Sequence, residues 1–398
     1  MHNSRRSFLT NASLLAAGNL LGFRPFGMLN ALAQTASDYK ALVCIFMFGG
    51  NDANNMLIPF DTNGYMNYAS IRGPLALAQN TLLPLGQQAT FALHPSMPEI
   101  QALYNSGNAA FLANVGTLLS PTTKAQYQAK QVAQPSNLFS HPDQQLEWQN
   151  QMNSAAGNSG WAGRIADKLS TQYNPGALVP MITSIGGDTL FCNGTGTSPV
   201  SIGSSGPGAP NCSDHSYCAS RQATAQQLAN MNSGVTIVQE DNSITNNAFT
   251  YNTVLSDALK SATPLATVFP TTTPFGAQLS EVAKLIQVRA ALGVKRQIFF
   301  VGAGNFDTHS TQLTLQANLL AEVSPALGAF YQALQEMSLT NSVTAFTCSD
   351  FARTFQPYCK HPLAGHAQLP GTNTGTWPIP NTRPIRSEEH TSELQSLV

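Results

Sequence analysis

Residues 41–52 read ALVCIFMFGGND, in which an unbroken apolar run from 41 to 48 is followed by two glycines, an asparagine and an aspartate. A short apolar run that ends at glycine is typical of a strand buried on both faces, as in a parallel sheet. Stretches with helical spacing separate this run from later ones. The alternation predicts an α/β protein with a mostly parallel central sheet and helices on both faces. The later apolar runs lie at 109–115, 179–185, 297–301 and 343–347.

An acidic residue follows three of these predicted strands: Asp52, Asp307 in FDTH (306–309) and Asp350 in TCSDFAR (347–353). Because the carboxyl ends of parallel strands open on one crevice, the three carboxylates are predicted to share a divalent cation there, with His309 as a further ligand. The pattern does not distinguish zinc, calcium and magnesium. Two simpler roles stay open, because Asp52 can cap a turn and Asp307 can cap a helix that begins near residue 310.

The first residues resemble an export signal. Residues 4–9 read SRRSFL, a mildly apolar stretch follows, and residues 31–33 read ALA, a typical cleavage site. This pattern predicts a twin-arginine signal over 1–33, recognition by the twin-arginine export machinery and a periplasmic or secreted product. No later apolar run approaches the roughly 20 residues that cross a bilayer, so we expect no membrane span.

The last residues have a different origin. Residues 386–396 read RSEEHTSELQS, which a common sequencing-library adapter encodes when translated. We therefore expect 386–398 to be a disordered artefact, 358–385 to be irregular and the natural protein to be longer. The predicted domain covers 39–357 and includes a Gly/Ser/Pro-rich surface insertion over 186–220.

Composition narrows the class of partner. The chain has 398 residues, 10% of them charged, with a net charge of −1. A chain with so little charge has no excess of basic residues with which to bind nucleic acid or an anionic membrane. The expected partner is therefore a small molecule or another protein. The oligomeric state is not indicated.

Five of the six cysteines fall into two groups, and Cys359 lies in the irregular stretch. Cys44 and Cys348 lie in apolar runs and are predicted to be buried thiols. Cys192, Cys212 and Cys218 lie in the insertion, where export permits one disulfide. Their spacing matches no usual zinc pattern, although His215 is nearby.

Several blocks in order resemble the exported bacterial domain-of-unknown-function family 1501. The resemblance spans about 41–357. The blocks are FGGND (48–52), NVG (114–116), SH before DQQ (140–145) with Trp148, GWAGR (160–164), FDTH with Gln312, and SDFART (349–354).

That family is grouped with the alkaline-phosphatase and sulfatase superfamily, whose members hydrolyse or transfer phosphate and sulfate esters with divalent cations. The resemblance implies an alkaline-phosphatase-like fold, incomplete at its C-terminus here, with metal ligands at strand ends. Asp52 matches the first metal-binding aspartate, and Asp350 matches the aspartate of a Ser-Asp-His-Gly motif in which Phe351 replaces the histidine. A later Gly-Thr-Asp-His appears only as GTNT (371–374).

Ester hydrolysis in this superfamily also needs a nucleophile. Ser140 is our first candidate, with His141 beside it, Arg353 to steady the oxyanion, and Thr117 as a weaker competitor. Ser140 can equally be a helix N-cap, and Arg353 can equally anchor Asp350. We interpret His94 and His215 as surface or packing residues.

The expected function is that of an exported metal-dependent hydrolase of small-molecule phosphate or sulfate esters. The alternative is a non-catalytic secreted binding or assembly protein on the same fold. Phe351 and the missing Asp-His favour this alternative.

Overall fold

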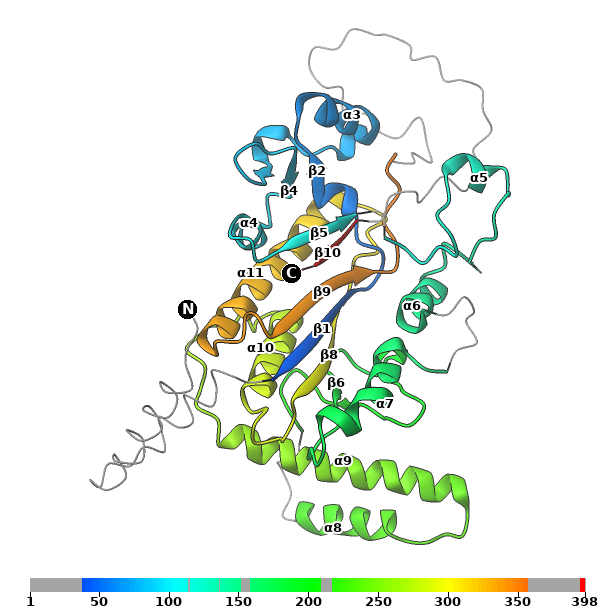
Figure 1. Cartoon of the computed structure of the whole chain (residues 1–398), viewed down its shortest axis with the longest axis vertical. Coiled ribbons are helices and arrows are strands. Elements are labelled where there is room, and N and C mark those ends of the chain that lie inside the picture. The colour runs from blue at the N-terminus through cyan, green and yellow to red at the C-terminus, as the bar shows by residue number, and fades with distance from the viewer. Residues whose placement is uncertain are drawn as a thin grey trace, which may run out of the picture. The chain divides into compact units, whose positions relative to one another are not determined.

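The apolar run at 41–48 forms β1 (Lys40–Met47), the middle strand of a seven-stranded sheet in the computed structural model of the chain (Figure 1). β1 pairs in parallel with β8 (Arg296–Ala303) on one side and with β9 (Val343–Ser349) on the other. The sheet order is β5-β10-β9-β1-β8-β6-β7, and the five strands from β9 to β7 run parallel. The predicted α/β fold is therefore confirmed.

The structure describes residues 38–113, 115–135, 137–151, 158–208, 217–356 and 394–397. The predicted signal, the irregular stretch at 358–385, Cys212 and His215 lie outside these residues. The remaining strands of the large sheet are β5 (Ala110–Ala113), β6 (Ile182–Ser184), β7 (Val200–Ser201) and β10 (Leu394–Leu397). A small antiparallel sheet contains β2 (Leu57–Pro59), β3 (Leu83–Pro84) and β4 (Phe91–Leu93). The α-helices are α3 (Thr62–Arg72), α4 (Pro98–Asn105), α5 (Lys124–Gln128), α6 (His141–Asn150), α7 (Trp161–Tyr173), α8 (Cys218–Ala229), α9 (Thr236–Lys260), α10 (Pro274–Gln287) and α11 (Gln312–Glu336).

Helices cover both faces of the sheet. Cys44 and Phe46 of β1 share a buried cluster with Phe300 of β8 and Ala162 of α7. Successive strand residues point to opposite faces, so Val43 lies on the other side, where α10 contacts β8 and packs against α11. Figure 1 shows α6 and α7 on one side and α10 and α11 on the other. Among the described helices none combines the length and the apolar character that a bilayer crossing requires.

The insertion expected over 186–220 is more than a surface loop. Its described part supplies the edge strand β7 and a 3₁₀ turn, Leu190–Cys192, in which Phe191 and Cys192 are buried. Cys192 is a free thiol, and so are the buried Cys44 and Cys348, as predicted for the latter two. The composition misled because α7 packs directly on this backbone, with a Cβ at Gly163 falling 2.1 Å from Asn193.

The tail expected to be disordered contributes β10. It runs antiparallel to β5, with Leu394 opposite Ala113, and meets β9 where Leu397 lies opposite Phe346. β5 and β9 do not pair with each other, so each would present unpaired backbone groups in this gap. An inserted strand satisfies those groups by backbone pairing, which any extended segment can provide.

His94 packs inside the protein, in line with its interpretation as a packing residue. Only 3% of its surface is exposed, and its Nδ1 accepts a hydrogen bond from the Ser96 amide at 3.0 Å. Burial lowers the pKa of His94 from 6.5 to about 4. The imidazole is therefore neutral in the folded protein at neutral pH.

This burial predicts a pH-dependent loss of stability. Between pH 6.5 and about 4 the unfolded chain binds a proton at His94 that the folded chain does not, so the free energy of unfolding falls as the pH falls through this window. The loss due to His94 is on the order of 2–3 kcal/mol. In His94→Asn, whose amide oxygen can accept the Ser96 hydrogen bond, urea unfolding measured from pH 7 to 4 should show a correspondingly smaller loss.

His309→Asn is the matched control, because that side chain is 75% exposed. It leaves His94 buried, so the loss of stability due to His94 should persist in this variant. An identical pH dependence in His94→Asn and wild type would contradict the assignment.

Candidate functional site at the carboxyl end of the sheet

The segments that follow β1, β8 and β9 meet at one edge of the sheet. The Phe306 amide donates a hydrogen bond to the Phe48 carbonyl at 3.0 Å, and the Gly49 amide lies 3.3 Å from each carboxylate oxygen of Asp350. Gly49 has a φ of +111°, and a Cβ there would lie 2.4 Å from the Asp307 nitrogen. Glycine thus permits the close approach of the β1 and β8 ends at this edge.

Asp350 is fully buried and holds α6 against this edge. Its Oδ2 accepts hydrogen bonds from His141 Nδ1 at 2.7 Å and Gln145 Nε2 at 2.8 Å. The Trp148 indole donates to the Asp350 carbonyl at 3.0 Å. Both carboxylate oxygens are therefore engaged by the protein itself, and Asp350 acts on the site through His141.

His141 connects the two acidic residues. A carboxylate oxygen without a proton only accepts, so Nδ1 is the donor to Asp350, and in the neutral imidazole Nε2 then carries the lone pair. That Nε2 lies 3.7 Å from Asp307 Oδ1, and the ring stacks on Phe351 with centroids 4.5 Å apart. Phe351 stands where the resemblance leads us to expect a histidine, and an imidazole from α6 lies against it instead.

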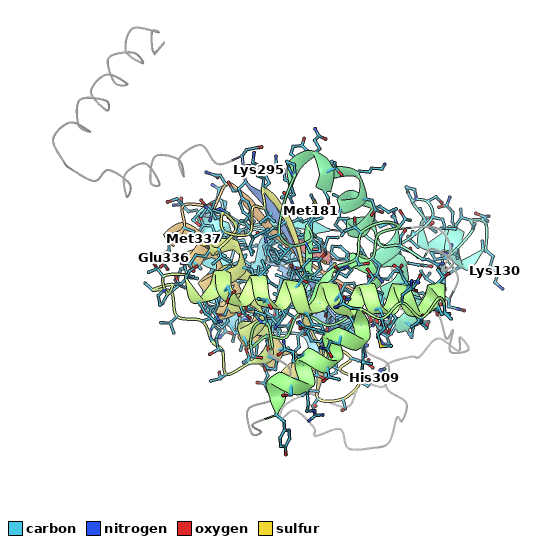
Figure 2. All side chains as sticks on the ribbon, turned by 90° about the horizontal axis from the view of Figure 1, so that it is seen from below. Lys130, Met181, Lys295, His309, Glu336 and Met337 are labelled. Atoms are coloured by element: carbon cyan, nitrogen blue, oxygen red, sulfur yellow. The ribbon has the colours of Figure 1, made fainter. Side chains whose placement is uncertain are left out.

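Asp307 is the open member of the group, with 43% of its side chain exposed. Its Oδ1 lies 2.8 Å from Arg353 Nη1 and 2.7 Å from His309 Nε2. Arg353 therefore pairs with Asp307, and the expectation that it could anchor Asp350 is wrong. Figure 2 labels the exposed His309. The helix-cap alternative for Asp307 is also wrong, because α11 begins at Gln312 with Thr311 in the capping position.

The Asp52 carboxylate makes its contacts outside this group of residues. Its side chain and that of Arg72 are both buried, and its Oδ2 forms an ion pair with Arg72 Nη2 while accepting a hydrogen bond from Gln312 Nε2 at 2.9 Å. Burial raises the pKa of Asp52, against the opposing effect of Arg72. Its Oδ1 is buried without a hydrogen-bond partner among the described residues.

Five predicted site residues therefore lie in contact, and two do not join them through any described contact. Ser140 immediately precedes His141 at the N-cap of α6, but its hydroxyl makes no capping hydrogen bond. The Thr117 hydroxyl donates to Gln144 at 2.6 Å, which weakens it as a competing nucleophile. The five in contact are His141, Asp307, His309, Asp350 and Arg353, while Asp52 and Ser140 stand apart.

Sequence reasoning missed the residues that fix this geometry. Gln145 and Gln312 belong to the motif blocks, but nothing in the sequence indicates which side chains they contact. Arg72 ends α3 and belongs to no motif. Its partner Asp52 is twenty positions away, a spacing that no local pattern encodes.

Some of these residues suit a metal ion. Asp307, His309 and His141 supply the donor types, one carboxylate and two imidazoles, that catalytic zinc sites use. Asp350 behind His141 matches the carboxylate that orients a ligating histidine. Within the described residues, no three His, Cys, Asp or Glu side chains are grouped as they are around a bound ion. A cation would have to displace Arg353 from Asp307.

Comparison with known proteins gives one match. A family model with the description "Protein of unknown function (DUF1501)" matches residues 39–366. No curated protein and no solved structure matches the chain.

The buried Asp52–Arg72 pair predicts a large stability effect. In Arg72→Met the Asp52 carboxylate loses its counter-ion inside the protein, so the free energy of unfolding should fall by about 3–5 kcal/mol. Denaturant titration checks this. The double variant Arg72→Met with Asp52→Asn should recover part of the loss, because no buried charge remains.

Lys260→Met is the matched control. It breaks the Lys260–Asp257 pair, whose side chains are 76% and 65% exposed. The expected cost is below about 1 kcal/mol. Equal losses in the two single variants would show that burial gives the Asp52–Arg72 pair no special role.

Proposed function

We propose that this chain, which belongs to the DUF1501 family of proteins of unknown function, is a metal-dependent hydrolase of phosphate or sulfate esters. The proposal rests on the geometry of its site. The observation that carries the proposal is the contact chain Asp350–His141–Asp307. In it, a buried carboxylate holds one imidazole nitrogen at 2.7 Å while the other nitrogen faces an exposed carboxylate. A carboxylate that holds the second ring nitrogen of a histidine in this way is the arrangement that orients metal-ligating imidazoles.

We propose a divalent cation at this edge, held by Asp307, His309 and His141 Nε2. The two imidazoles favour zinc over calcium or magnesium, which prefer oxygen ligands. When bound, such a cation polarises the ester and neutralises developing negative charge. The proposal assigns Asp350 to orienting His141 and Asp52 to a supporting pair with Arg72, so neither is a direct ligand.

The protein's own groups supply the remaining roles. Arg353 is 15% exposed and carries further guanidinium nitrogens that can hold a phosphate or sulfate oxygen. The start of α6 presents backbone amides that favour an anion, with the Ser140 hydroxyl free of a capping role. Ser140 is thus the proposed nucleophile, and Gln145 keeps Asp350 and hence His141 in place.

We also propose export. The twin-arginine pattern over 1–33 supports a periplasmic or secreted protein that meets a small-molecule ester outside the cytoplasm.

One observation favours the second candidate, a non-catalytic secreted binding or assembly protein. The Asp307 Oδ1 is already in contact with Arg353 Nη1 and His309 Nε2. Such a self-paired network can hold strand ends together without binding a metal ion.

Metal analysis and hydrolysis of an aryl phosphate and an aryl sulfate separate the two candidates. The full chain should retain about one metal ion and hydrolyse at least one ester. Asp307→Asn should lose the metal ion and lower kcat/KM by at least about 100-fold, since a direct ligand is removed. Asp350→Asn should weaken metal binding by roughly 10–100-fold, because it only orients His141.

Asp257→Asn serves as the control, because this acidic residue on α9 is 65% exposed and pairs with Lys260. It should keep metal content and activity. If the folded wild-type chain takes up neither zinc, manganese, magnesium nor calcium and turns over neither ester, the non-catalytic candidate stands.

A further inference from the structure

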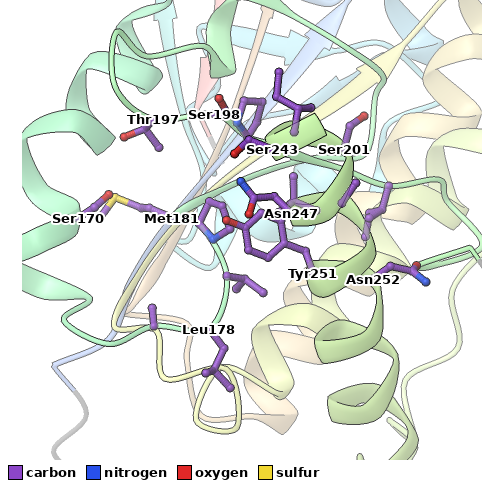
Figure 3. Close-up of a pocket in the computed structure, with 18 of the residues that line it drawn as sticks. Ser170, Leu178, Met181, Thr197, Ser198, Ser201, Ser243, Asn247, Tyr251 and Asn252 are labelled. Carbon is purple, nitrogen blue, oxygen red and sulfur yellow. The ribbon is translucent and has the colours of Figure 1, made fainter. Parts of the chain in front are cut away.

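A large groove lies beside the outer strand β7, and the site described above uses none of its lining residues. Its volume is about 1310 Å³. Small-molecule sites typically measure roughly 300–1,000 Å³, so this groove has room for several linked rings. One wall is α9, the opposite wall is the segment 196–203, and Leu178 and Met181 lie on the stretch that leads into β6 (Figure 3).

The polar groups on α9 form one stripe. Ser243, Asn247 and Tyr251 are spaced four residues apart, which places them on one face of the helix. In Figure 3 they project from α9 toward the segment that carries Ser198 and Ser201. The side chains of these five residues make no hydrogen bond to any other part of the chain that the structure describes. Their donors and acceptors are therefore available to a ligand.

The charge of the groove excludes anionic ligands. Its described lining residues include no Lys, Arg or His, and the charged groups among them are the carboxylates of Asp188 and Glu240. A phosphate or sulfate group would find no cation here and would meet repulsion. The groove thus differs in kind from the sheet edge with Arg353, and it does not suit an anionic ligand.

The edge strand β7 offers few free backbone hydrogen-bonding groups to an extended peptide. Peptides that add to a sheet bind by a ladder of backbone hydrogen bonds. β7 has only two residues, Pro199 before it has no amide hydrogen, and the Ile202 amide already donates to Ser184. Recognition in this groove must come from side chains.

We propose that this groove binds a neutral oligosaccharide. Sugar hydroxyls donate and accept at once, and Asn and Ser side chains can match both roles. The Tyr251 ring offers an apolar face for the C–H surface of a sugar ring, with a hydroxyl at its end. The groove and the sheet-edge site are independent, so binding here does not require the proposed ester hydrolysis.

Isothermal titration calorimetry on the full chain tests the proposal with cellohexaose, maltohexaose, xylohexaose and chitohexaose as probes. At least one should bind with a Kd below about 1 mM, within the range of weak specific affinities. Tyr251→Ala and Asn247→Ala should each weaken that binding by about tenfold or more. Thr253→Ala, on an exposed position of the same helix, should leave it unchanged.

Asn247 is exposed, so its truncation leaves the fold intact and keeps the test valid if Tyr251→Ala is unstable. Three results would overturn the proposal: no hexasaccharide binds at millimolar concentration, the Asn247→Ala variant binds as tightly as wild type, or a sulfated hexasaccharide or an extended decapeptide binds more tightly than every neutral probe.

Discussion

The arrangement of the sheet edge depends on one buried carboxylate. Asp350 has no exposed surface, yet it contacts the β1 end through the Gly49 amide and α6 through His141 and Gln145. A carboxylate out of water is stable only when hydrogen bonds replace its hydration. Because those donors come from two separate segments, satisfying Asp350 requires both segments to be in place.

The other charged side chains that are buried near this edge meet the same constraint. Only 10% of the residues are charged, and those that are buried near the edge each have a specific partner. Asp52 forms an ion pair with Arg72. Arg72 also donates hydrogen bonds to the Thr354 and Phe355 carbonyls at 2.9 and 3.0 Å. Arg72 therefore fastens the segment after β9 to the turn after β1. Apolar packing adds to these polar contacts, because Phe355 also lies against the buried cluster that contains Ile58 and Tyr68.

The sequence was a good guide to strands and to where their ends meet, because both follow from general rules. An apolar run of eight residues has to be buried, and parallel strands open on a common edge. The sequence was a poor guide to which side chains contact each other. His141 and Asp350 are 209 positions apart, and nothing local at either residue encodes the pairing. Composition also misled at 186–208, because Gly160 and Gly163 at the start of α7 let that helix pack closely on the backbone of this segment.

The pairing of His141 with Phe351 bears on how an imidazole can reach this edge. Position 351 directly follows Asp350, and Phe351 lies so close to the β1 turn that a Cβ at Gly50 would fall 2.9 Å from its ring. A histidine in that position would have a polar ring pressed between this turn and His141, and the two imidazoles would compete for nearby acceptors. An apolar ring there instead gives His141 a flat surface to stack on, so its orientation is set by packing on one side and by Asp350 on another. The imidazole at the edge thus comes from a helix of a distant segment, and the aromatic residue that follows the aspartate supports it.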